Sequence, residues 1–252
     1  MGAISLFDVD GTLTPPKEKI DKSFADKFLN WMTDKEVYIV SGGSFVRIIN
    51  QLGLDVVERC TGVFACMGNI FYQKIDTIND VGYSQWEVVY ENKFFAPKGL
   101  YKDLDNIVKK SKYHTKTGKH YEERVGMINF SIVGRNATIE QRKEYSAFDK
   151  SSEEREEIVK LLKENYTSLD FAIGGAVSID IFNIGNDKSQ IIDKHFGDSF
   201  NSNEVIFFGD RIAFPGNDYP LATALSEYKL TRSYEVKDWQ ETAHILNKSQ
   251  FV

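Results

Sequence analysis

The stretch Phe7-Asp8-Val9-Asp10-Gly11-Thr12-Leu13-Thr14 decides the fold, because it ends an apolar run over residues 3–9 with two carboxylates and a glycine. The run predicts a β-strand, in which residues two apart point the same way. Asp8 and Asp10 can therefore face one pocket at the carboxyl end of the strand, where open α/β sheets bind ligands. Two charges that close need a cation or a proton between them, and Mg²⁺ suits carboxylate oxygens. Asp-Gly is also a common turn dipeptide, so this stretch alone leaves a surface turn open.

Three further segments carry polar groups near predicted strand ends or helix starts. Ser41-Gly42-Gly43-Ser44 follows a second apolar strand and precedes a helix, where glycines let backbone amides approach an oxyanion. Lys188 opens a predicted helix after Asn186-Asp187. Phe207-Phe208-Gly209-Asp210 ends a later strand, and Gly216-Asn217-Asp218 follows it. Together these segments argue against a surface turn at the first stretch.

The two ends of the chain alternate between the strand and the helix period. The predicted strands are 3–9, 37–40, 62–66 and 204–208, and the predicted helices are 21–34, 45–52 and 188–196. This alternation is typical of a parallel sheet wrapped by helices.

The middle of the chain has a different texture. Its predicted helices are 98–110 and 152–164, and its predicted strands are 125–133, 169–173 and 177–182. Helices grouped with hairpin-like strands suggest an α+β unit. We therefore predict an α/β protein with a Rossmann-like parallel-sheet core, residues 1–81 and 184–252, and an inserted α+β cap domain, residues 82–183.

The four motifs, in this order, resemble the signature of the haloacid dehalogenase superfamily. The resemblance implies that Asp8 is the nucleophile and that Asp10 is the general acid and base. It further implies a Mg²⁺ ion held by Asp8, the backbone carbonyl of Asp10 and Asp210, with Asp218 supporting the metal shell.

The same resemblance implies that Ser44 and Lys188 hold the phosphoryl group during transfer. A carboxylate that attacks a phosphoryl group forms an aspartyl-phosphate, and a lysine and a metal ion can offset the charge on its oxygens. The general acid must then donate a proton to the leaving oxygen and take one from the next acceptor.

The middle segment resembles the cap of the eukaryotic-type phosphomannomutases. The matching residues are Arg124-Val-Gly-Met-Ile-Asn-Phe-Ser-Ile-Val-Gly-Arg135, Glu140-Gln141-Arg142 and Ile173-Gly-Gly-Ala-Val-Ser178-Ile-Asp180-Ile-Phe, with Thr14-Pro15 and Gln51-Leu52-Gly53 in the core. The resemblance covers essentially the whole chain. It implies that the three arginines grip the phosphate that is not being transferred, and that Ser178 and Asp180 contact sugar hydroxyls. Without it, a single cap arginine would be a solvated surface charge and Asp180 a hydrogen-bonded structural carboxylate.

Two departures from the family are visible. Lys17 stands where a further substrate-binding arginine is usual, so the charge is kept and the bidentate geometry is lost. Ala222 and Ala224 stand where acidic residues usually hold a second cation.

The bulk composition narrows the partners. The chain of 252 residues has a net charge of -6 and 42% hydrophobic residues, which argues against nucleic-acid or anionic-membrane binding. No secretory signal and no apolar run of about 18 residues is visible, so we expect a cytoplasmic protein without a membrane span. Cys60 and Cys66 are too few for a disulfide framework.

The resemblance implies an enzyme that interconverts mannose 6-phosphate and mannose 1-phosphate for GDP-mannose biosynthesis. It implies Mg²⁺ and a hexose 1,6-bisphosphate activator, hexose phosphate substrates, and a homodimer formed through the caps. Two alternatives stay open: a sugar-phosphate phosphatase with the same core, and a non-catalytic phosphosugar-binding protein.

Overall fold

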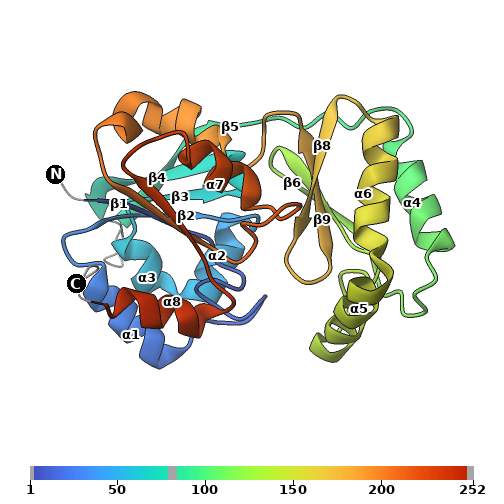
Figure 1. The fold of residues 1–252 in the computed structure, drawn as a ribbon, viewed down its shortest axis with the longest axis horizontal. Helices are drawn as coiled ribbons and strands as arrows, with labels where there is room; N and C mark the ends of the chain where they lie inside the picture. The colour runs from blue at the N-terminus through green and yellow to red at the C-terminus, as the bar shows by residue number, and fades with distance from the viewer. Residues whose placement is uncertain (1–2, 79–83, 249–252) are drawn as a thin grey trace.

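The computed structural model describes residues 3–78 and 84–248, which form two sheets side by side (Figure 1). The larger sheet has the strand order β11 (Thr231–Glu235), β10 (Val205–Gly209), β1 (Ile4–Phe7), β2 (Glu36–Val40), β3 (Gly62–Ala65), β4 (Ile70–Ile78) and β5 (Ser84–Glu91). The five strands from β11 to β3 are parallel, and β4 and β5 extend the sheet as an antiparallel hairpin. The parallel strands all end on the same edge, which is where ligand sites are expected.

Helices cover both faces of this sheet. One face is covered by α1 (Lys22–Trp31), α2 (Phe45–Leu52), α3 (Leu54–Arg59) and α8 (Trp239–Leu246). The other is covered by the π-helical turn η2 (Ile192–Phe196), the 3-10 turn η3 (Gly197–Asn201) and α7 (Tyr219–Leu225). A further 3-10 turn, η1 (Cys66–Gly68), follows β3.

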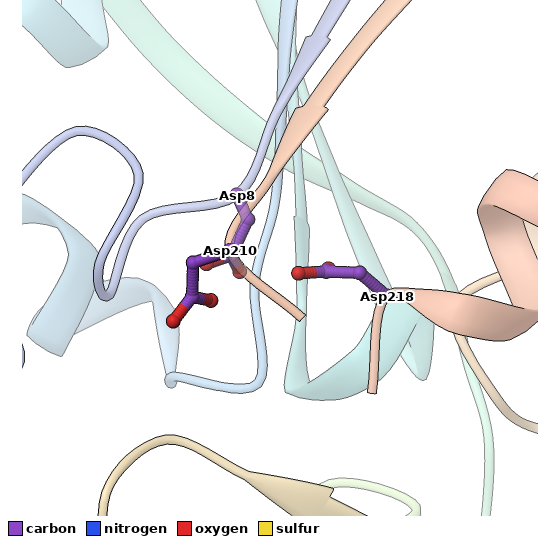
Figure 2. Close-up of side chains that lie close together, drawn as sticks. All are labelled: Asp8, Asp210 and Asp218. Atoms are coloured by element: carbon purple, nitrogen blue, oxygen red, sulfur yellow. The ribbon is translucent and has the colours of Figure 1, made fainter. Parts of the chain in front are cut away.

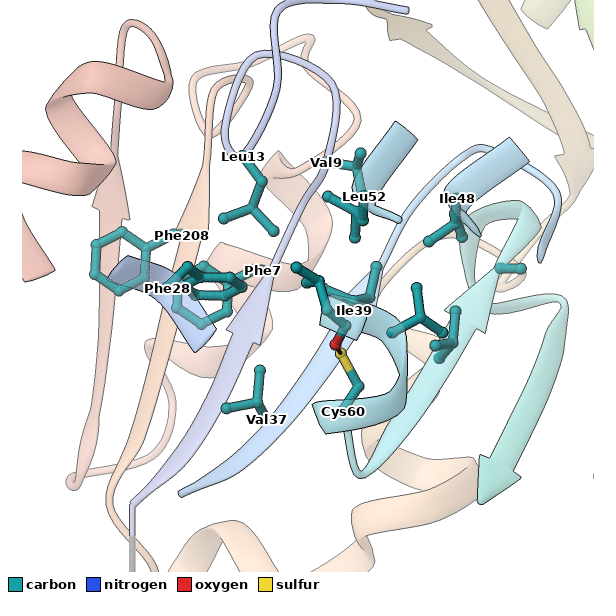
Figure 3. Packing of buried hydrophobic residues seen from close by; sticks show 14 of the residues in the cluster. Phe7, Val9, Leu13, Phe28, Val37, Ile39, Ile48, Leu52, Cys60 and Phe208 are labelled. Atoms are coloured by element: carbon teal, nitrogen blue, oxygen red, sulfur yellow. Dashed lines mark hydrogen bonds between the residues drawn. The ribbon is translucent and has the colours of Figure 1, made fainter. Parts of the chain in front are cut away.

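Buried aromatic rings fix the strand that carries the first motif. Phe7 stacks on Phe208 of β10 with ring centroids 5.0 Å apart, and the ring of Phe28 from α1 meets Phe7 edge-on at 5.2 Å (Figure 3). All three side chains are at most 3% exposed. The residue after Phe7 is therefore held at a fixed place on the sheet edge.

The smaller sheet is antiparallel and has its own core. Its strand order is β6 (Tyr121–Arg124), β7 (Met127–Phe130), β9 (Ser178–Asn183) and β8 (Leu169–Gly174). Its helices are α4 (Leu100–Lys110), α5 (Ile139–Ser152) and α6 (Glu154–Asn165). Leu104, Tyr145 and Leu162 pack from these three helices into one cluster with the sheet. A capping box between Thr138 and Gln141 sets the start of α5.

The predicted fold class is confirmed, and some boundaries move. The expected boundary between residues 81 and 82 lies outside the described residues, but β5 pairs with β4, so the chain leaves the larger sheet after Glu91. Lys188 lies before the helical turns rather than at their start, because Asp187 accepts hydrogen bonds from the amide and hydroxyl of Ser189. The sequence pattern did not predict α3, β4, β5, β6, α5, α7, β11 or α8 individually.

None of the described helices combines the length and the apolar character that a membrane crossing requires.

Candidate active site

Three carboxylates meet at the carboxyl edge of the larger sheet (Figure 2). Asp8 directly follows β1, Asp210 directly follows the neighbouring strand β10, and Asp218 precedes the first residue of α7. The amide of Asp8 donates to the carbonyl of Phe208, which ties the two strand ends together. Each carboxylate offers an oxygen that lies within 4.8 Å of the other two. The first and fourth motifs thus form one cluster.

A buried lysine offsets part of this negative charge. Nζ of Lys188 donates to Oδ1 of Asp8 and to Oδ1 of Asp218, each at 2.6 Å, and its side chain is fully buried. Burial and the neighbouring carboxylates raise the pKa of Asp8 and of Asp210. Burial by itself would lower the pKa of Lys188, but Asp218 and Asp8 raise it. The lysine is therefore charged. One positive charge does not balance three carboxylates, so the cluster can attract a further cation.

The donor set fits Mg²⁺. Carboxylate oxygens at close range are ligands that this hard cation accepts, and no histidine or cysteine belongs to the group found among the described residues. The backbone leaves space for the carboxylates: a Cβ on Gly11 would lie 2.5 Å from Oδ2 of Asp210, and one on Gly209 would lie 2.6 Å from Oδ2 of Asp218. Glycine is required at both positions for this close approach.

The carboxylate of Asp10 accepts three hydrogen bonds, from Lys17, Arg47 and Gln51. Its Oδ1 accepts from the amide of Lys17 at 2.6 Å and from Nε2 of Gln51 at 2.9 Å, and its Oδ2 accepts from Nη2 of Arg47 at 2.7 Å. Nε of Arg47 in turn donates to Oε1 of Gln51 at 3.0 Å. The Asp10 carboxylate faces the cleft beside Asp8, as a group that moves protons to and from a substrate oxygen must.

Arg47 and Gln51 were not predicted as site residues. They lie four residues apart on α2, so their side chains share one helix face. That helix directly follows Ser41-Gly42-Gly43-Ser44. A polar pair at this spacing on a mostly apolar helix was the available signal.

A cleft of about 430 Å³ lies between the two sheets and opens over Asp8. Ser41, Gly42 and Gly43 line it, and Ser44 lines a separate hollow with Phe45, Glu122 and Val125. Ser41 is 2% exposed, and its Oγ accepts from the amide of Gly43 at 3.1 Å. The structure therefore brings Ser41 to the cleft in place of Ser44.

Cationic side chains also line this cleft. Arg124 and Arg142 line it from the smaller sheet and α5, and Lys17 lines it from the core. Nη1 of Arg124 donates to the carbonyl of Gly42 at 2.6 Å, which joins the two halves of the molecule. Nη1 of Arg142 is buried and has no hydrogen-bond partner among the described residues. Such a group is suited to an incoming anion.

Arg135 occupies a supporting place. It is not among the described residues that line the cleft; its guanidinium instead donates to Glu122 and to Oδ1 of Asn129.

The pKa of Lys17 reports the charge around it. Burial lowers this pKa to about 6, together with the nearby positive charges of Arg142, Arg135 and Arg47. This mutual repulsion identifies a strongly positive region around Lys17.

The two residues expected to contact a sugar lie in the same cleft as the carboxylate cluster and the cations. Ser178 and Asp180 both line the cleft from β9. Oδ1 of Asp180 accepts from Nδ2 of Asn129 at 2.6 Å, and its side chain is buried, which raises its pKa. A Cβ on Gly174 would lie 2.5 Å from Oδ2 of Asp180, so the last residue of β8 approaches this carboxylate closely.

Solved structures support the fold. The chain matches an IMP-nucleotidase of Plasmodium falciparum with a TM-score of 0.58 at 16% identity, covering 97% of this chain and 67% of that one. It also matches a subclass IIB sugar phosphatase of the haloacid dehalogenase superfamily with a TM-score of 0.56 at 15% identity, covering 99% and 100%.

Several curated proteins are more similar in sequence to this chain than these solved structures are. The chain is 32% identical to phosphomannomutase 2 of Dictyostelium discoideum over 97% of this chain and 95% of that protein. It is 33% identical to human phosphomannomutase 1 over 86% and 82%. Residues 25–251 match the family model of the eukaryotic phosphomannomutases. The chain therefore belongs to the eukaryotic phosphomannomutase family of enzymes.

Proposed function

We propose that the protein interconverts mannose 6-phosphate and mannose 1-phosphate, carrying the phosphoryl group on Asp8. The observation that supports this most directly is one cleft that contains both the carboxylate cluster and several arginines. A hexose bisphosphate has two phosphates, so it matches a cleft with cationic groups beyond those that hold the transferring phosphoryl group. A phosphatase would not need these further cations.

The residues of the core divide the chemistry between them. An oxygen of Asp8 attacks the phosphorus atom, the bond from phosphorus to the sugar oxygen breaks, and that oxygen takes a proton from Asp10. Lys188 lies against Asp8 and offsets negative charge on the phosphoryl oxygens. When bound by Asp8, the carbonyl of Asp10, Asp210 and the supporting Asp218, Mg²⁺ supplies further positive charge at these oxygens. In the return step Asp10 takes a proton from the other sugar hydroxyl, which attacks the phosphorylated Asp8.

The cleft also supports the bisphosphate intermediate. Arg124, Arg142 and Lys17 line the part of the cleft that would hold the phosphate at rest, and Ser178 and Asp180 lie where a sugar ring would pass. For both phosphates to visit Asp8, the bisphosphate must turn over between the half-reactions. A hexose 1,6-bisphosphate would therefore activate the enzyme by phosphorylating Asp8, and glucose phosphates should be handled as well.

Three further proposals concern Arg135, the assembly and the location. We propose that Arg135 acts on the distal phosphate through Glu122 and Asn129, which it contacts, and not by direct binding. We propose a homodimer formed through the caps and a cytoplasmic location.

One assay tests the proposed function. The enzyme is given mannose 1-phosphate and Mg²⁺, with and without glucose 1,6-bisphosphate, and both mannose 6-phosphate and free phosphate are followed. The Asp8→Asn variant is the matched control, because the amide is a poor nucleophile in an unchanged shape. We expect the bisphosphate to raise isomerisation, with phosphate released far more slowly. Stoichiometric phosphate release without isomerised sugar would replace the mutase by a sugar-phosphate phosphatase, and saturable binding without turnover would indicate a phosphosugar-binding protein.

A further inference from the structure

The loop between β10 and α7 docks on the smaller sheet. The amide of Ile173 in β8 donates to the carbonyl of Pro215 at 3.3 Å, and Ile173 forms a parallel β-bridge with Gly216. Nη2 of Arg211 donates to the carbonyl of Gly175 at 3.0 Å. In Figure 1 this loop precedes α7 and reaches from the core toward β8 and β9. The contact joins the core to the turn between those two strands.

Arg211 also contacts the carboxylate cluster. Its amide donates to Oδ2 of Asp218 at 3.0 Å, and its carbonyl accepts from the amide of Asp218 at 3.1 Å. Its Nε lies 3.5 Å from Oδ2 of Asp210. The backbone of Arg211 therefore contacts Asp218, and its guanidinium contacts both Asp210 and the carbonyl of Gly175 in the other half of the molecule.

The turn that Arg211 reaches forms part of the cleft wall and is held from its own side by a buried ion pair. Gly174, Gly175 and Ser178 line the cleft. Nη1 of Arg155 donates to the carbonyls of Gly175 and Ser178 at 3.1 and 3.2 Å. The carbonyl of Gly175 thus accepts one charged donor from each half of the molecule.

The Arg155 side chain is itself rigidly placed. Its Nε donates to Oδ2 of Asp149 at 2.7 Å and its amide donates to Oδ1 of the same residue at 2.8 Å. Arg155 and Asp149 are 5% and 7% exposed. A buried, doubly hydrogen-bonded pair of this kind fixes the turn relative to α5 and α6.

We propose that Arg211 is a positioning residue for phosphoryl transfer, which latches the β8–β9 turn over the carboxylate cluster and so holds Ser178 and Asp180 opposite Asp8. A charged donor on a shared carbonyl favours the closed arrangement, because opening would leave that carbonyl with one donor. Closure brings a sugar hydroxyl into line and excludes water. The kinetic part of this proposal rests on the proposed function, whereas the latch itself does not.

The latch is tested by hydrogen exchange on the free, full-length protein, with Arg211→Met. The Ile173 amide bonds across the contact, so its exchange reports opening directly. We expect exchange at Ile173 to speed up by about ten- to hundred-fold, the usual effect of losing a charged hydrogen-bond partner. The matched control is Arg232→Met, which removes an exposed arginine from β11 and should leave Ile173 unchanged.

A reference amide separates a latch from general destabilisation. Leu6 lies in β1 at the centre of the larger sheet, and its exchange reports opening of the core. A larger increase at Ile173 than at Leu6 supports the latch. An unchanged Ile173, or the same factor at both amides, overturns it.

A kinetic measurement then asks what the latch does. In Arg211→Met we expect the turnover rate for isomerisation to fall while phosphate release per turnover rises, since water reaches the phosphorylated Asp8 more often. A fall in both rates by the same factor would overturn the positioning role. If the wild-type enzyme proves to lack mutase activity, the proposed function fails, and the exchange result still decides the latch.

Discussion

Nη2 of Arg47 lies 2.7 Å from Oδ2 of Asp10, so a charged side chain from α2 occupies one of the two oxygens that could exchange a proton with substrate. Gln51 and the amide of Lys17 hold the other oxygen. The carboxylate is therefore fixed in orientation before a sugar arrives.

Arg47→Met should impair transfer to and from sugar oxygens more than transfer from an aryl phosphate. A sugar oxygen is a poor leaving group that needs a well-placed proton donor, whereas a phenolate leaves without one. Losing a charged hydrogen bond costs about 1.5 to 3 kcal/mol, or about a ten- to hundred-fold loss of kcat/KM. Rates with mannose 1-phosphate and p-nitrophenyl phosphate are compared, with Arg59→Met as an exposed control. Equal losses with both substrates would show that Arg47 does not act through Asp10.

The chemistry at the sheet edge could be predicted because it depends on local sequence. Asp8 and Asp210 each follow an apolar strand, and parallel strands bring their ends to one edge; the resemblance of the motifs implied that the two carboxylates share one Mg²⁺ site. The contacts of Arg47 could not be predicted in this way. They depend on how α2 packs across the first motif, and an arginine on a helix is usually a solvated charge.

The limits of the fold prediction have similar causes. β5 is an exposed edge strand with few buried side chains, and such a strand gives a weak signal. α5 has few buried side chains, Tyr145 and Asp149, so its apolar period is faint. Ser41 and Ser44 both flank the same glycines, and the tertiary structure decides which one faces the cleft.

Lys188→Met should destabilise the free protein strongly. Its side chain is fully buried between Asp8 and Asp218, and removing one partner of a buried ion pair typically costs about 3 to 5 kcal/mol. Added Mg²⁺ should restore part of the loss, because it replaces the missing positive charge. The free energy of unfolding in urea, with and without Mg²⁺, measures both effects, and Lys229→Met serves as an exposed control. A variant as stable as the wild type would contradict the predicted coupling of Lys188 to these carboxylates.

Gly11→Ala should weaken Mg²⁺ binding in addition to straining the backbone. Gly11 has φ of 92°, and a Cβ there would lie 2.5 Å from Oδ2 of Asp210. Gly53→Ala is the matched control, since Gly53 has φ of 81° but no neighbour within 4 Å of its Cβ. Both variants should lose about 1 to 3 kcal/mol of stability, because a residue with a Cβ is strained at positive φ. Calorimetric titration with Mg²⁺ should show weakened binding in Gly11→Ala alone; equal affinities would mean that Asp210 does not hold the metal.

Arg142→Ala should raise KM for mannose 1-phosphate and for the bisphosphate alike, by about ten- to hundred-fold. Its Nη1 is buried in the cleft without a partner among the described residues, so a phosphate can take that place. Arg135→Ala should change KM less, because that side chain is bound to Glu122 and Asn129. Steady-state kinetics on both variants measure KM for mannose 1-phosphate and for the bisphosphate. A larger KM effect from Arg135 would reverse the roles assigned to the two arginines.

The two serines of the second motif offer a matched pair, because they flank the same glycines and only one lines the cleft. Ser41 is 2% exposed, lines the cleft with Asp8, and accepts a hydrogen bond from the amide of Gly43. That bond fixes the turn whose amides can approach a phosphoryl oxygen.

Ser44 precedes α2, and its side chain makes no capping hydrogen bond within the described residues. Ser41→Ala should therefore lower the turnover rate by about three- to ten-fold, the range for one neutral hydrogen bond, while Ser44→Ala leaves it within about two-fold. Single-turnover phosphorylation of Asp8 by the bisphosphate measures the step directly, and urea unfolding checks that both variants fold. If Ser44→Ala is the slower variant, the hydroxyl at the transferring phosphoryl group is the one that the family resemblance implied, and α2 must shift when substrate binds.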